Sequence, residues 1–176
     1  WAMFALVWNR REQMDNGYLL FIGIAYIFVA GIDLVHTLAY KGMGVFVGYD
    51  ANLPTQLWIA ARYMQSLSLL VAPFIMQKKL SPGLIMVSYS AVFILLLSSI
   101  LIWGVFPACY IEGSGLTPFK KVSEYIISLI LLAAIALLWR KRSEFDLAVL
   151  KRLVWSLLAT IGSEIAFTFY ISVYGF

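Results

Sequence analysis

Charged residues are scarce in this chain of 176 residues. They make up 12% of the sequence, against roughly 25% in soluble globular domains. Hydrophobic residues make up 62% and aromatic residues 16%. So few charges cannot cover the surface of a water-soluble domain of this length. The composition therefore excludes an ordinary soluble domain and indicates a membrane protein.

Cysteine and histidine are nearly absent. The single Cys109 excludes an internal disulfide, and one histidine excludes a multi-histidine metal site or a haem held by two histidines. The sequence has no phosphate-binding glycine loop, no nucleophile elbow and no lysine deep in a hydrophobic segment. It has no soluble basic surface for nucleic acid. We therefore expect neither an enzyme nor a nucleic-acid-binding protein, and metal and cofactor stay unknown.

Long hydrophobic segments fill most of the chain. The range 80–111 contains 32 residues without Asp, Glu, Lys or Arg, and every other full segment contains at least one of them. The other full segments are Gly17–Tyr40, Pro54–Met76, Phe119–Trp139 and Leu153–Tyr174, and Trp1–Trp8 is a partial one. The prediction is an all-α, polytopic transmembrane helical bundle with five full spans and an N-terminal partial span.

Three helix starts have capping chemistry. Ser81 and Thr117 each stand directly before a proline, which has no amide hydrogen that needs a partner in the first turn. Asn52, two residues before Pro54, is a looser version. Pro73 should bend or loosen the end of its span.

The distribution of Lys and Arg predicts the orientation of the bundle. Nine of these residues fall in loops on one side, three lie on the other, and Arg62 lies within a span. The side with more Lys and Arg is expected to be cytoplasmic. The nine are Arg10, Arg11, Lys78, Lys79, Arg140, Lys141, Arg142, Lys151 and Arg152; the three are Lys41, Lys120 and Lys121. The loops 42–53 and 107–116 should then face outward.

Ionisable residues inside the spans are candidates for function, because burying them in lipid is costly. Asp33, His36 and Tyr40 share one helix face with Thr37. Arg62 shares a face with Trp58 and Gln65, and Glu164 shares one with Thr160 and Thr168. Helix rise places Asp33, His36, Arg62 and Glu124 in the outer half and Glu164 near the middle. These faces predict a polar chamber, open outward, in which Arg62 neutralises an acid.

Simpler interpretations stand beside this one. A buried Arg–carboxylate pair can serve helix packing alone, and His36 can be a hydrogen-bonded structural residue. Lys41, Lys120 and Lys121 are the type of residue that extends its amine to the membrane surface. Cys109, in an outer loop, is expected to be unreactive.

Five runs in this sequence resemble the third family of bacterial membrane-associated sensor (MASE-type) domains, and the likeness covers nearly the whole chain. The runs begin at Asp33 (DLVHTLAYKGM), Leu57 (LWIAARY), Phe106 (FPACYIEG), Gly115 (GLTPFK, followed by SEY) and Ser163 (SE, followed by FT and Tyr170). The resemblance implies an integral-membrane input module, usually fused to cytoplasmic PAS, histidine-kinase or diguanylate-cyclase domains. The chain 1–176 is then one sensor domain truncated at both ends, with any enzymatic output domain outside it.

The family motifs coincide with the polar residues chosen on physical grounds and add Glu112 and Lys120. The predicted ligand-binding residues are Asp33, His36, Tyr40, Trp58, Arg62, Glu112, Lys120, Glu124 and Glu164. The predicted function is a sensor that binds a small ligand, an ion or a proton and signals to an output domain, with a homodimer as a possible partner state. The alternatives are a transporter or proton-conducting bundle that uses the same carboxylates, and a purely structural anchor.

Overall fold

The structure is a computed structural model that describes residues 2–9, 17–76, 78 and 80–168. These residues are mostly helical and contain one short β-hairpin. The helices are α1 (Ala2–Asn9), α2 (Gly17–Leu38), α3 (Asn52–Val71), α4 (Pro82–Leu101), α5 (Pro118–Arg140) and α6 (Leu147–Thr168). The strands are β1 (Tyr110–Ile111) and β2 (Gly115–Leu116), and short 3₁₀ turns occupy Lys41–Met43, Ala72–Ile75 and Arg142–Glu144.

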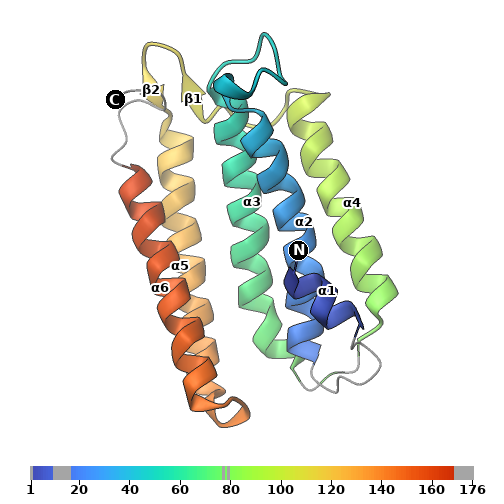
Figure 1. The fold of residues 1–176 in the computed structure, drawn as a ribbon. Coiled ribbons are helices and arrows are strands. Elements are labelled where there is room, and N and C mark those ends of the chain that lie inside the picture. The colour runs from blue at the N-terminus through green and yellow to red at the C-terminus, as the bar shows by residue number, and fades with distance from the viewer. Residues whose placement is uncertain (1, 10–16, 77, 79, 169–176) are drawn as a thin grey trace.

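The axes of the five long helices are roughly parallel, with successive helices pointing in opposite directions, and the short α1 lies against α2 (Figure 1). Helix α2 packs against both α3 and α4, α3 packs against α5, and α5 packs against α6. The α5–α6 pair therefore meets the α2–α3–α4 group mainly through α3. This position makes α3 the central helix of the bundle and brings polar residues from α2, α5 and α6 close to it.

The span expected over 80–111 is only partly helical. Ser81 Oγ accepts a hydrogen bond from Leu84 N at 3.5 Å, so the predicted cap is present, and the helix ends at Leu101. Gly104 has a φ of 60°, in the left-handed region that favours glycine, which turns the chain away from the helix axis. An uncharged run is thus long enough for a span but does not mark where the helix stops.

The rest of that run leads into the hairpin, a strand element that the sequence did not predict. Tyr110 pairs with Leu116 and Ile111 pairs with Gly115 in antiparallel register. Thr117 then caps α5 as expected, because its Oγ1 accepts from Lys120 N at 3.2 Å. The end of the bundle that carries β1 and β2 is called the hairpin end below.

The ends of α2 and α3 differ slightly from the prediction. Helix α2 ends at Leu38 and leaves Tyr40 outside, whereas α3 begins at Asn52 and changes at Ala72 to a 3₁₀ turn that contains Pro73. The loosening expected at Pro73 is confirmed. Asn52 does not act as a cap, because Ala51 holds that position without a side-chain hydrogen bond.

Helix α6 begins six residues before the predicted Leu153. Asp146 Oδ1 accepts from the backbone nitrogens of Ala148 and Val149 at 2.8 and 3.2 Å, which satisfies free amides of the first turn. The hydrophobic run missed this turn because Lys151 and Arg152 interrupt it. The predicted end at Tyr174 lies outside the described residues.

Among the described residues, three helices are long and apolar enough to cross a membrane: α2, α4 and α5. Most of α4 is exposed, with apolar side chains such as Leu84 and Ile94 on its surface, as expected for a face that meets lipid. Helices α3 and α6 have the length but carry more polar residues. Five full spans therefore remain a prediction, whereas the helical class is established.

Six of the described basic residues lie at the end of the bundle opposite the hairpin. Lys78 follows α3, the Arg140–Arg142 segment joins α5 to α6, and Lys151 and Arg152 lie in the first turns of α6 (Figure 1). Lys41 and Lys121 lie at the hairpin end. The helix directions thus place the two predicted groups of basic residues at opposite ends; Arg10, Arg11 and Lys79 lie outside the described residues.

Candidate functional site

An ion pair joins α2 to α3. Nη2 of Arg62 donates to both carboxylate oxygens of Asp33, at 2.7 and 2.8 Å. The Arg62 side chain is 13% exposed and that of Asp33 is 38% exposed. The sequence predicted that Arg62 would neutralise Asp33 or a glutamate, and Asp33 is its hydrogen-bonded partner.

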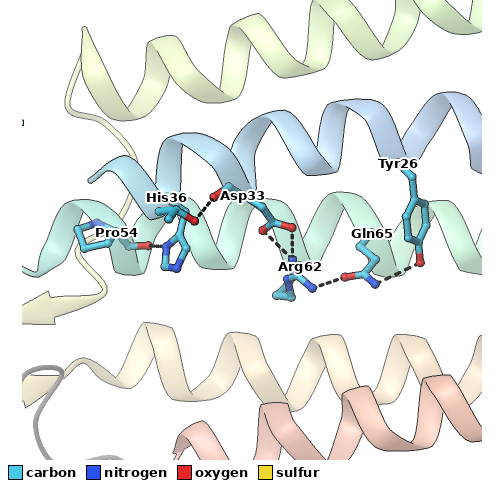
Figure 2. Close-up of polar contacts among 7 residues, drawn as sticks. Tyr26, Asp33, His36, Pro54, Arg62 and Gln65 are labelled. Atoms are coloured by element: carbon cyan, nitrogen blue, oxygen red, sulfur yellow. Dashed lines mark hydrogen bonds and ion pairs between the residues drawn. The ribbon is translucent and has the colours of Figure 1, made fainter. Parts of the chain in front are cut away.

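Further contacts hold the guanidinium in place. Nη1 of Arg62 donates to Gln65 Oε1 at 2.5 Å, and Gln65 Nε2 donates to the Tyr26 hydroxyl at 3.2 Å. The guanidinium carbon also lies 4.7 Å from the centre of the Trp58 ring, a cation–π geometry. Figure 2 shows Asp33, Arg62, Gln65 and Tyr26 in a row along the facing sides of α2 and α3. Tyr26 was missed by the sequence analysis, although it precedes Asp33 by seven residues and so shares its helix face.

His36 connects α2 to the first turn of α3. Its Nδ1 lies 2.7 Å from the Pro54 carbonyl oxygen (Figure 2). A carbonyl only accepts, so Nδ1 carries the hydrogen and donates it. The imidazole also lies 5.5 Å from the Trp58 ring and 6.4 Å from the Tyr40 ring, between ring centres. These contacts fit the structural interpretation of His36 and leave Nε2 for another partner.

A second ion pair is buried on α5. Lys120 Nζ donates to Glu124 Oε1 one helical turn away, and the two side chains are 5% and 0% exposed. The Lys120 amine also lies 5.9 Å from the centre of the Phe167 ring on α6. Lys120 is therefore not a residue that extends to the membrane surface, as one interpretation of the sequence had it. Lys41 and Lys121, in contrast, are exposed.

Glu164 on α6 lies in the same region and is fully buried. Neither carboxylate oxygen has a hydrogen-bond partner in the structure. Its interacting polar neighbours come from two other helices: Trp58 and Arg62 on α3, and Lys120 and Glu124 on α5. The Trp58 and Phe167 rings meet edge to face, 5.2 Å apart, one turn toward the hairpin end. Arg62 is thus bonded to Asp33 on one side and interacts with Glu164 on the other.

The nine predicted residues divide into groups. Asp33, His36, Trp58 and Arg62 lie together between α2 and α3; Lys120, Glu124 and Glu164 lie together between α5 and α6. Trp58 and Arg62 connect the groups, because both also interact with Glu164. Tyr40 is 41% exposed beyond the end of α2, and Glu112 is exposed in the turn of the hairpin. Whether these residues bind a ligand stays a prediction.

Comparison with known protein families assigns the chain to one of them. The family model of MASE3, described as a membrane-associated sensor domain, matches residues 1–176, the whole chain. The chain belongs to the MASE3 family. No curated protein and no solved structure gives a significant match. MASE3 is a sensor input domain rather than a catalytic one, and the apolar helices of this MASE3 domain agree with a membrane location.

The MASE3 domain also has a cavity of about 350 Å³ at its hairpin end. The start of α3, the end of α4 and the loop 104–108 line it, and none of the nine predicted residues does. Two α3 side chains hold that loop. Gln56 Nε2 donates to the carbonyls of Phe106 and Pro107, and Asn52 Oδ1 accepts from the backbone nitrogens of Cys109 and Tyr110. The sequence pattern predicted a loose helix cap at Asn52 and no role for Gln56.

Cys109, in the loop before β1, is fully buried. Burial raises the pKa of its thiol to about 12; Lys120 lowers the pKa and Glu124 raises it, both by smaller amounts. At neutral pH the thiolate, which is the reactive form, is therefore rare. The geometry supports the prediction that Cys109 is unreactive.

Within the described ranges, no group of three or more His, Cys, Asp or Glu side chains is close enough to hold a metal ion jointly. A site for a ligand in this region therefore has to use the carboxylates in pairs, together with neutral side chains.

Proposed function

We propose that this chain is the signal-input domain of a sensory protein in the bacterial inner (cytoplasmic) membrane. It binds a small ligand, an ion or a proton among the polar residues of α2, α3, α5 and α6. It relays the binding to a cytoplasmic histidine-kinase or diguanylate-cyclase domain that follows in the full-length protein. The family supplies the role of sensor, and the position of Arg62 is the observation that carries the mechanism.

Arg62 is the shared element of the proposed relay. Its Nη atoms are bonded to Asp33 and Gln65, whereas Nε has no partner in the structure and Glu164 lies near enough to interact. A ligand that changes the charge at Glu164 changes the balance between the two acids that attract the guanidinium. Because Asp33 and Glu164 are on α2 and α6, this balance alters the packing of both helices against α3. A ligand shifts such an equilibrium only by its difference in affinity for the two arrangements.

In the proposed topology all five long helices cross the membrane. The hairpin end faces outward and the basic end faces the cytoplasm, as the Lys and Arg distribution favours. Helices α3 and α6 cross despite their polar residues because the ionisable residues in the middle of these helices, Arg62 and Glu164, are turned inward, as intramembrane ionisable residues usually are. A second copy of the full-length protein is a possible partner.

Single substitutions in a full-length protein test this proposal. Asp33→Asn, Arg62→Gln and Glu164→Gln each remove one charge with little change in shape. We expect each to alter the output activity, measured as autophosphorylation or cyclic-di-GMP synthesis, with unchanged membrane insertion. Glu144→Gln, in the 3₁₀ turn between α5 and α6, is the matched control. Wild-type output from all three variants would exclude the polar residues from signalling.

The buried carboxylates Glu124 and Glu164 also favour a second candidate, a transporter or proton-conducting bundle, because intramembrane acids mark ion pathways as well. Flux measured in proteoliposomes separates the two functions. A transporter gives uptake or a proton current that Glu164→Gln abolishes, whereas a sensor binds without net movement.

A further inference from the structure

Buried polar atoms without hydrogen-bond partners gather where α3, α5 and α6 meet. The acceptors among them are Oε2 of Glu124, both carboxylate oxygens of Glu164 and Oγ of Ser128; the N–H groups at Nε1 of Trp58 and Nε of Arg62 lie beside them, and both side chains interact with Glu164. Ser128, which is 6% exposed, follows Glu124 by one helical turn and so lies on the same face of α5. Native interiors leave few polar atoms unsatisfied. A group of them on three neighbouring helices therefore indicates a site that another atom completes.

The charges of this region do not balance. Asp33, Glu124 and Glu164 carry three negative charges when ionised, and Arg62 and Lys120 carry two positive charges. Arg62 is bonded to Asp33, and Lys120 is bonded to Glu124. Glu164 is then left without an ion pair in a fully buried position. An isolated carboxylate in such a place is not tolerated, so it takes up one positive charge.

The available donor atoms restrict the chemistry of that charge. The unpartnered acceptors are all carboxylate or hydroxyl oxygens, which bind hard cations. One added unit of positive charge neutralises the region, whereas a divalent ion would leave it positive. The described residues also lack the three-carboxylate group that a divalent ion would use. The surplus of acids excludes an anionic ligand.

We propose that α3, α5 and α6 form a site for one monovalent cation, either a proton or Na⁺, held between Glu124 and Glu164 with Ser128 Oγ beside it. This inference rests on the proposed function and names the class of its ligand. The Trp58 and Phe167 rings are in contact with each other beside the site, on the side toward the hairpin end. With the cation bound, Glu164 exerts no net attraction on Arg62. Without it, ionised Glu164 competes with Asp33 for the guanidinium.

Infrared difference spectroscopy tests the site in the reconstituted full chain. Buffer is exchanged over the immobilised sample in two series, one stepping pH in choline chloride and the other replacing choline with Na⁺ at fixed alkaline pH. If the occupant is a proton, a protonated-carboxyl band disappears as pH rises. If it is Na⁺, the carboxylate bands shift on Na⁺ addition and the shift saturates. Either response supports the site and identifies the cation.

Variants assign the response to these side chains. Glu164→Gln is expected to abolish it. Glu164→Asp, which keeps a carboxyl group, should retain a response at a displaced frequency. Glu144→Gln, whose wild-type carboxylate pairs with Lys141 at 3.5 Å and is partly exposed, should leave the response unchanged. The amide bands of the same spectra report whether each variant is folded.

The proposal would be overturned if folded wild-type protein showed no spectral response to pH or Na⁺, or if the response persisted unchanged in Glu164→Gln. The experiment measures occupancy rather than output, so it separates the two proposals. Occupancy with unaltered signalling in the full-length variants would leave the cation site standing and refute the sensor mechanism. Altered signalling without a cation response in the spectra would refute the cation site and leave the sensor mechanism standing.

Discussion

Two regions of this membrane domain hold acids in opposite ways. Between α2 and α3, Asp33 is 38% exposed, yet both of its oxygens are bonded to Arg62. Near α5 and α6, Glu164 is fully buried, yet neither of its oxygens has a partner in the structure. The more exposed acid is thus the paired one, and the fully buried acid is the unpaired one. In the first region an ion pair joins two helices, whereas the second holds a buried, unpaired carboxylate for which we propose a cation.

The difference depends on which helix carries the positively charged side chain of each ion pair. Arg62 stands on α3 and reaches across to α2, so its bond to Asp33 joins two helices. Lys120 stands on the same helix as Glu124, so their bond stays within α5 and leaves Glu164 on α6 unpaired. An inward-facing Lys or Arg on α6 would pair with Glu164, and both regions would then hold paired acids.

The largest expected effect comes from removing the Asp33–Arg62 ion pair. Arg62→Met leaves Asp33 unpaired and deprives Glu164 of a positive neighbour. We expect the free energy of unfolding to fall by about 3 kcal/mol, because breaking an ion pair from one side leaves an uncompensated charge. Thermal unfolding in detergent measures this change.

The double variant Asp33→Asn with Arg62→Met should recover part of that loss, because the unpaired acid is gone. Arg152→Met, at an exposed position on α6, is the matched control and should change stability by less than about 0.5 kcal/mol. Equal losses in the single and double variants would show that the Asp33–Arg62 pair does not account for the loss.

A smaller effect of opposite sign is expected in the region of Glu164. Glu164→Met removes a buried, unpaired carboxylate and replaces it with an apolar side chain of similar length. In choline chloride at alkaline pH, we expect the free energy of unfolding to rise by about 1 kcal/mol. Glu144→Met provides the comparison at a partly exposed acid. A loss of more than about 1 kcal/mol in Glu164→Met would mean that Glu164 has a stabilising partner, and the contrast between the regions would disappear.

The smallest effect is expected at Cys109, which reports on the α5 pair from outside the helices. A pKa of about 12 against an ordinary 9.0 lowers the thiolate fraction at neutral pH by about three orders of magnitude, so alkylation by a maleimide should be slow. Because the charge of Glu124 raises this pKa, Glu124→Gln should lower it and speed alkylation a few-fold. Asp33→Asn, in the other region, should leave the rate unchanged. Equal rates in the Glu124→Gln variant and the wild type would show that the α5 pair has no effect on the thiol.

The sequence predicted the helices well and their ends less well. The prolines after Ser81 and Thr117 marked two helix starts correctly, because a cap and a proline act within one turn. The uncharged range 80–111 was too long, since hydropathy does not register that α4 ends at Leu101 or that the chain turns at Gly104. Lys151 and Arg152 hid the first turn of α6, because charges that lie outside the hydrophobic core do not interrupt a helix.

The sequence predicted that ionisable residues of different helices lie close together, but not how they pair. Helical spacing placed Asp33 and His36 on one face, and the need to neutralise buried charge predicted that Arg62 pairs with Asp33 or with a glutamate, without deciding which. The same reasoning missed Tyr26, Gln56 and the loop-holding role of Asn52. It also allowed Lys120 to extend to the membrane surface, because a sequence does not show that Phe167 and Glu124 enclose that amine.

By itself, the sequence determined the membrane environment, the helical class and the residues costly enough in lipid to need a partner, since these depend on composition and on spacing within one helix. Only the tertiary structure decided which partner each residue has. Arg62 reaches Asp33 because α3 packs against α2, and Glu164 lies unpaired because α6 faces α5 and α3 at a level where both nearby cations are already bonded. Pairing between helices depends on their packing and register, which no spacing along a single helix contains.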